Sequence, residues 1–162
     1  MSWLSVGRWS PLRLSRRLRD TYRGADDVRF SLQLALFVWR LPDRMAQQPL
    51  PAFLEDLRRA PRPPAPDLRA SVERIDRLSR PWFATVFRAR NTCYVRSLMF
   101  CRFADAGERA LRIHFVVEPR RGDRLRGHAW VSAGNEYCEP PKPEWLSAAT
   151  RFYSYPAEDG AA

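Results

Sequence analysis

Asn91-Thr-Cys-Tyr-Val-Arg-Ser-Leu-Met99 opens a predicted helix over about residues 92–104 and places a cysteine in its first turn. Asn91 and Thr92 are residue types that cap helix starts. The unpaired N–H groups and the positive dipole end of such a start favour a thiolate over a thiol. Cys93 is therefore a candidate nucleophile, whereas the alternative for any lone cysteine is a packing role.

A small antiparallel sheet is predicted after this helix. Its strands are expected at residues 111–118, at 127–133 and, after the two-residue hairpin signal Gly134-Asn135, at 136–139. The first strand alternates apolar and polar residues, so one of its faces is expected to be buried. Helices followed by one helix on an antiparallel sheet make α+β the expected fold class.

Only helices are predicted in the N-terminal half. The first covers about residues 28–40, with N-cap chemistry from Asp26 and Asp27 and an end before Pro42. A short amphipathic element follows at 50–57.

A proline-rich connector at residues 60–66 leads into the next predicted helix. Asp67 caps this helix, and Pro81 closes it. Its apolar residues recur at spacings of four, three and three, which indicates one buried stripe: Leu68, Val72, Ile75 and Leu78.

Arginine dominates the charged residues. The sequence has 28 Lys+Arg against 18 Asp+Glu, a net charge of +10, and Lys142 is its only lysine. Such a field favours an acidic partner: a nucleic acid, an anionic membrane surface or an acidic peptide. The amphipathic residues 1–24 could lie on a membrane surface, but we favour a helix docked on its own domain.

The cysteines are expected to be free thiols. Cys93, Cys101 and Cys138 form no CxxC pair, so neither a disulfide framework nor a zinc site is expected. Free thiols suit a reducing cytoplasm. Arginines interrupt every apolar stretch of a secretory signal, and Leu32–Trp39 is too short to span a membrane, so we expect a soluble, cytoplasmic protein.

Two histidines are available as the base. His114 falls on the polar face of the first strand, and we interpret it as a half-exposed strand residue. His128 shares a face with Trp130 in Gly127-His-Ala-Trp-Val131. If Ala133 pairs with Glu136 across the hairpin, the next strand carries a carboxylate diagonally across from His128.

That carboxylate is Glu139, which could hold the imidazole as the third member of a nucleophile-base-orienter set. A three-residue loop would instead put Cys138 on this face. Glu136, Asn135 or no side chain at all remain alternatives for the orienting role.

The cysteine motif, the alternating strand and the Gly127–Val131 motif together resemble the transglutaminase-like cysteine peptidases of lasso peptide biosynthesis, the B2 proteins. The resemblance covers about residues 67–140. It implies a transglutaminase-like or papain-like core in residues 67–155, after a helical region in 1–66 and before a flexible tail in 156–162.

The resemblance also implies a Cys-His-Asp triad that cuts the leader from a ribosomally made precursor peptide. Cys93 and His128 carry over, but no aspartate follows the hairpin before Asp159, so Glu139 is taken as the substitute. Implied partners are the precursor leader peptide, a separate leader-recognition protein and an asparagine-synthetase-like macrolactam cyclase. No cofactor and no metal are implied.

The expected site also needs donors for the oxyanion, and two other functions compete with the peptidase. The Cys93 backbone N–H would donate to the oxyanion, and Asn91 is the candidate second donor. The missing aspartate favours a precursor-binding scaffold of the same fold, while the arginine content favours a nucleic-acid-binding protein. The mixed, aromatic-poor face of the first strand argues against nucleic acid.

Overall fold

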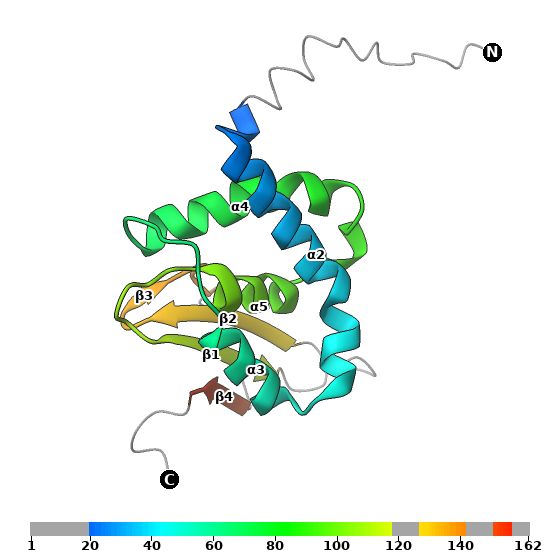
Figure 1. Cartoon of the computed structure of the whole chain (residues 1–162). Helices are drawn as coiled ribbons and strands as arrows, with labels where there is room; N and C mark the ends of the chain where they lie inside the picture. The colour runs from blue at the N-terminus through cyan, green and yellow to red at the C-terminus, as the bar shows by residue number, and fades with distance from the viewer. Residues whose placement is uncertain (1–19, 118–126, 142–150, 157–162) are drawn as a thin grey trace, which may run out of the picture.

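The computed structural model describes residues 20–117, 127–141 and 151–156 (Figure 1). Its helices are α2 (Ala25–Gln47), α3 (Leu50–Arg59), α4 (Leu68–Ala84), the short 3-10 helix η1 (Arg88–Arg90) and α5 (Cys93–Phe103). The strands are β1 (Leu111–Val117), β2 (Gly127–Ala133), β3 (Glu136–Tyr137) and β4 (Arg151–Tyr155). They form one antiparallel sheet in the order β3-β2-β1-β4, so the expected α+β class is confirmed. Residues 1–19 of the N-terminal amphipathic segment and residues 157–162 of the predicted tail lie outside the described residues.

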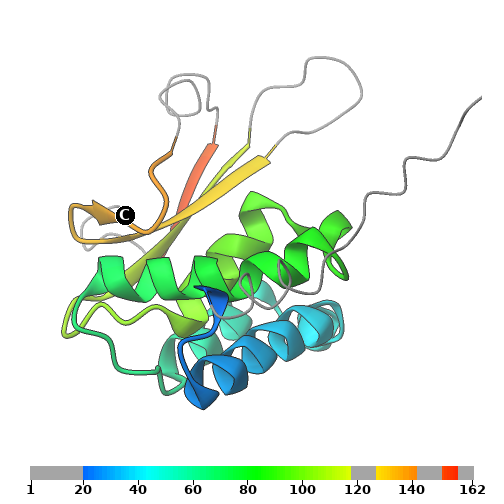
Figure 2. The same ribbon diagram turned by 90° about the horizontal axis from the view of Figure 1, so that it is seen from above.

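All the helices lie on one side of the sheet (Figure 2). Alternate residues of β1 and β2 face the helices and belong to one hydrophobic core with all four α-helices. These strand residues are Leu111, Ile113, Val131 and Ala133. α5 is the helix that packs most closely on β2. The helices on both sides of the connector at 60–66 share this core, which fixes α5 against the strand that carries His128.

α2 continues through Pro42, so the predicted end before that proline is wrong. A proline inside a helix cannot donate to the carbonyl four residues earlier, which here is Val38. Arg90 donates to that carbonyl instead, with Nη1 2.9 Å from Val38 O and 3.2 Å from Trp39 O. A side chain from η1 therefore supplies the hydrogen bond that the proline removes.

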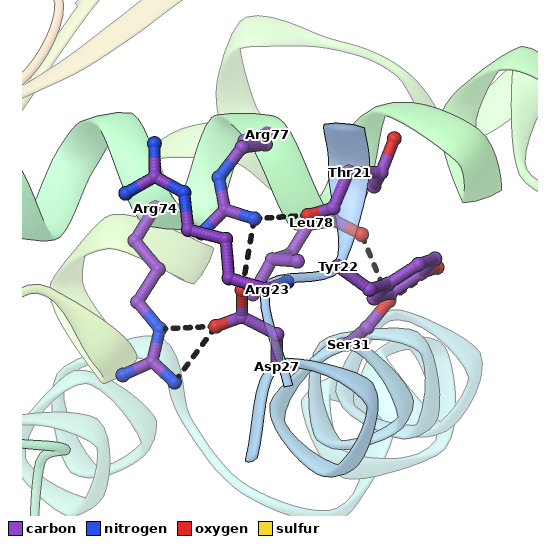
Figure 3. A network of polar contacts seen from close by, with 8 residues as sticks. All are labelled: Thr21, Tyr22, Arg23, Asp27, Ser31, Arg74, Arg77 and Leu78. Carbon is purple, nitrogen blue, oxygen red and sulfur yellow. Dashed lines mark hydrogen bonds and ion pairs between the residues drawn. The ribbon is translucent and has the colours of Figure 1, made fainter. Parts of the chain in front are cut away.

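The start of α2 also differs from the prediction, because Gly24 is the N-cap residue and no side chain caps the helix. Asp27 lies in the first turn, buried between α2 and α4 (Figure 3). Its carboxylate contacts Arg74 at 3.0 Å and Arg77 at 2.9 Å, and it accepts from the Arg23 backbone N–H at 3.1 Å. Arg77 also donates to the carbonyl of Thr21. Asp27 thus joins the two longest helices.

α4 begins as predicted, since the Asp67 carboxylate accepts from the Ala70 backbone N–H at 2.7 Å. Its expected stripe faces the core, with Val72 half-buried and the other members buried. The helix passes Pro81 and ends only at Ala84, one turn later than predicted. This last turn carries Phe83 into the core.

The hairpin register is confirmed, because Ala133 pairs with Glu136 around Gly134, whose φ is 60°. β3 is shorter than predicted and ends at Tyr137, although the Cys138 N–H still donates to Val131 O at 2.9 Å. β4 was not predicted and pairs with the free edge of β1.

Candidate functional site

Cys93 is the first residue of α5, as the sequence predicted. Thr92 caps this helix, and its hydroxyl accepts from the Val95 backbone N–H at 3.3 Å. The cysteine side chain is half-buried, and its Sγ lies 3.8 Å from the carbonyl oxygen of Gly127. The helix start therefore meets the first residue of β2, 34 positions further along the chain.

His128 directly follows Gly127 on β2 and is half-buried. It lies opposite Val116 of β1 in the antiparallel register. Consecutive Cα atoms are about 3.8 Å apart, so the backbone of His128 stands within one residue of the carbonyl that Cys93 contacts. Folding thus brings the two motifs of the sequence together at one end of the α5–β2 contact.

The other two thiols are not comparable with Cys93. Cys101 and Cys138 are buried, and burial raises the pKa of Cys101 to about 11 and that of Cys138 to about 12. Both side chains belong to the hydrophobic core. Of the three free cysteines, Cys93 alone is exposed in part and lies at a helix start.

Glu139 is held by an arginine of the cysteine helix. Its Oε2 lies 3.0 Å from Nε of Arg96, one turn after Cys93, while Nη2 of Arg96 contacts Asp76 Oδ1 at 3.0 Å. The sequence predicts Glu139 on the third strand, but β3 ends two residues earlier. Its carboxylate is therefore held toward α5 by this ion pair and not by strand pairing in the sheet.

Asp76 and Arg96 were missed as site residues. Burial raises the pKa of Asp76, the charge of Glu139 adds to that effect, and Arg96 opposes it. Arg96 carried a usable signal, because a residue three positions after a helical cysteine lies on a neighbouring part of the same face. Asp76 carried none, since only the packing of α4 against α5 brings it there.

The remaining candidates for the orienting role lie on the exposed hairpin. Asn135 is an exposed turn residue, and Glu136 is exposed and pairs with Arg109 at 2.9 Å. The carboxylate of Glu136 is thus engaged at the sheet edge.

His114 is buried, so its interpretation as a half-exposed strand residue is wrong. Nδ1 lies 2.8 Å from Ser154 Oγ, and Nε2 lies 2.8 Å from Ser132 Oγ. The ring also stacks on Trp130, with centroids 5.4 Å apart. Both nitrogens have hydroxyl partners contributed by β2 and β4, and the unpredicted β4 explains why the sequence did not indicate this burial.

A cavity of about 300 Å³ opens beside the start of α5. Asn91 and Arg96 border it from the cysteine side, and α4 supplies the other wall through Asp76, Ser79, Arg80, Phe83 and Ala84. Asn91 itself is exposed. The cavity is lined by one carboxylate, two guanidiniums, a hydroxyl and an amide, and Cys93 itself is not among its lining residues.

No group of three or more His, Cys, Asp or Glu side chains among the residues that the structure describes could hold a metal ion. No helix within the described ranges is long and apolar enough to cross a membrane.

Comparison with known proteins places the chain in a family. The family model of the transglutaminase-like superfamily matches residues 28–148, from the first turn of α2 to beyond β3. No curated protein and no solved structure matches the chain. The match contains both the cysteine at the start of α5 and the histidine of β2. The chain belongs to the transglutaminase-like superfamily.

Proposed function

We propose that this chain is a cysteine peptidase that removes the leader from a ribosomally made precursor peptide, as in lasso peptide maturation. The supporting observation is the 3.8 Å contact between Cys93 Sγ and the Gly127 carbonyl, which sets a first-turn cysteine against the strand of His128. Membership of the transglutaminase-like superfamily supports cysteine peptidase chemistry in general. The precursor substrate is inferred from the resemblance of the two motifs.

The proposed reaction runs through an acyl-enzyme. His128 accepts the Cys93 proton, and the sulfur attacks the carbonyl carbon of the peptide bond between leader and core. Collapse of the tetrahedral species breaks the C–N bond, and the leaving amine takes its proton from His128. Water, deprotonated by the same imidazole, then attacks the thioester, releases the leader as a carboxylic acid and regenerates the thiol.

The tetrahedral oxyanion needs hydrogen-bond donors aimed at it. The backbone N–H of Cys93 lies at the open start of α5, where no intrahelical acceptor is available for it. Asn91 borders the adjacent cavity and is the proposed second donor. Side chains of the substrate would enter this cavity, between α4 and the cysteine.

Glu139 is proposed to orient His128, with help from Arg96. Arg96 binds one carboxylate oxygen, Oε2, which leaves Oε1 for the imidazole. Oε1 is the atom that would accept from Nδ1–H or Nε2–H of His128. Arg96 is thus a positioning residue in this proposal, and Asp76 holds its other end.

The partners belong to the same proposal. A separate recognition protein would deliver the leader, and an asparagine-synthetase-like cyclase would close the macrolactam of the released core. A cytoplasmic location is part of it as well, because three free thiols suit a reducing compartment.

The test is cleavage of a lasso-type precursor peptide in the presence of a leader-recognition protein, with products followed by mass spectrometry. The parent chain should release the leader, and Cys93→Ala should abolish release while its circular dichroism and thermal unfolding stay unchanged. Cys101→Ala is the matched control and should retain cleavage.

Two outcomes would contradict the proposal. Cleavage by Cys93→Ala at the parent rate would show that Cys93 is not the nucleophile. Binding of the precursor by the parent chain without any cleavage would indicate a scaffold of the same fold.

A further inference from the structure

The outer face of α2 carries an apolar stripe that none of the residues described by the structure covers. Its members lie at spacings of four, four and three residues, on one face of the helix, and are between 45% and 62% exposed: Val28, Leu32, Leu36 and Trp39. The opposite face of α2 supplies core residues such as Leu34 and Val38. α2 lies on the side of the helical layer away from the sheet (Figure 2). A contiguous exposed apolar face of this kind is typical of an interaction site.

A basic groove begins at the same helix. This cavity of about 590 Å³ is shared by α2, the proline-rich connector and the end of α5. Leu36 of the stripe borders it, together with Phe37 and Phe103, so the stripe and the groove are continuous. The charged residues around it are all arginines: Arg40, Arg44, Arg62 and Arg102.

None of these four arginines forms an ion pair with a carboxylate in the part of the chain that the structure describes. Arg102 donates to Pro61 O, and Arg62 donates to Arg58 O and more weakly to Cys101 O, so both are held in place by neutral carbonyls. Arg44 and Arg102 also lie over the rings of Phe53 and Phe103.

The groove holds these cations at an energetic cost. Burial lowers the pKa of Arg102, and the neighbouring charges of Arg44 and Arg62 lower it further. The buried Nε of Arg62 has no acceptor among the described residues. The charge of Arg62 helps to lower the pKa of Asp105, but the two carboxylate oxygens of Asp105 already accept from the backbone N–H groups of Gly107 and Ala65.

We propose that the stripe and the arginine groove together form a docking site for an acidic amphipathic peptide segment. Its apolar residues would pack on Leu36 and Trp39, and its carboxylates would reach the arginines of the groove. The stripe runs over 12 residues of α2, from Val28 to Trp39, which is about 16 Å along the axis and matches the apolar face of a helical peptide of about three turns. Bidentate pairing with a carboxylate is the interaction for which a guanidinium is best suited.

This docking site is distinct from the cysteine site. Arg102 and Phe103 end the helix that Cys93 begins, so the groove lies about 14 Å along the axis of α5 from the thiol. A flat membrane contact is the less suitable occupant, because the arginines line a hollow beside the stripe rather than a flat surface around it. The site therefore fits a partner segment bound away from the reacting bond.

Fluorescence anisotropy with a labelled synthetic peptide tests the proposal. The probe is a peptide of about 14 residues, with leucines at three- and four-residue spacing and glutamates elsewhere. The full chain should bind it, Arg40→Glu/Arg44→Glu should weaken binding about 10-fold or more, and Leu36→Ser should do the same. Arg69→Glu reverses a charge on the exposed face of α4 and should bind as the parent does.

Thermal unfolding of each variant shows that it is folded before its affinity is compared. Equal binding of a peptide with the same composition but scattered leucines would overturn the proposal, since charge alone would then suffice. Equal binding by all variants would also overturn it. Binding to phosphatidylserine vesicles that the same variants abolish, without binding to the peptide, would assign the face to a membrane instead.

Discussion

Asp27→Asn removes the negative charge that joins α2 to α4 while keeping the shape of the side chain. The carboxylate is 8% exposed, and the side chains of Arg74 and Arg77 are 30% and 24% exposed. Breaking a fully buried ion pair costs about 3–5 kcal/mol, whereas an exposed pair contributes about 0–1 kcal/mol. Since the arginines keep part of their hydration, we expect the variant to lose about 2–3 kcal/mol of unfolding free energy.

Urea unfolding at pH 7 measures this loss as a decrease in the transition midpoint of about 1 M. Asp26→Asn is the matched control, because Asp26 is an exposed neighbour in the same helical turn. An equal midpoint for Asp27→Asn and the parent would refute the role of the network.

The difference in stability between the parent and Asp27→Asn should depend on pH. Burial raises the pKa of Asp27, but the hydrogen bonds from Arg77, the Arg23 backbone and Arg74 outweigh burial and hold that pKa below its ordinary value of 3.8. A carboxyl whose pKa is lower in the folded state stabilises the fold above its unfolded pKa and loses this effect as pH falls through the folded pKa. The difference between parent and Asp27→Asn should therefore be full at pH 6 and shrink below pH 3.8. A difference that stays constant from pH 6 to the acid transition would contradict this origin.

Two further predictions concern the contact of Arg90 with the Val38 carbonyl and the orienting acid. Arg90→Ala should lower the unfolding free energy by about 1–2 kcal/mol, because the Val38 carbonyl loses its donor. Arg88→Ala on the same short helix should change the unfolding free energy little. Equal effects of the two variants would contradict the role of Arg90. Glu139→Gln should slow precursor cleavage by about 10-fold to 10⁴-fold, by analogy with other triads that lose their orienting carboxylate. Glu136→Gln should cleave at nearly the parent rate, and parent rates for both would exclude a carboxylate of this hairpin.

Local sequence signals predicted most of the fold. Thr92 and Asp67 cap the helices that they were expected to cap, and the hairpin Gly134-Asn135 has the expected register. These features depend on neighbours within a few residues, so the sequence contains their full cause. The α+β class followed from their order.

Two of the errors arose where a distant segment supplies a missing partner. Pro42 did not end α2, because Arg90, 48 positions away, binds the carbonyl that the proline leaves free. The burial of His114 is not predictable from its own strand, because Ser154, one of its two partners, comes from β4, which the sequence did not indicate. A tertiary contact decided both cases.

The residues of the candidate site also fall into those that the sequence indicates and those that only the packing brings together. The capping pattern indicated Cys93, and the short list of histidines indicated His128, so both could be named from the sequence. The polar residues around them could not, because Arg96 reaches Asp76 and Glu139 only after α4, α5 and the hairpin have packed. The role of Glu139 stays a prediction.

Alkylation of the three thiols by iodoacetamide at pH 6 tests the Cys93–His128 pair most directly, with each site followed by peptide mass spectrometry. Cys93 should react about 10-fold or more faster than Cys101 and Cys138, because those two are buried with raised pKa values. His128→Ala should slow Cys93 about 10-fold at pH 6, while His114→Gln, the matched change at the other histidine, should leave the rate near that of the parent. Equal Cys93 rates in the parent and in His128→Ala would contradict the pairing of this cysteine with this histidine.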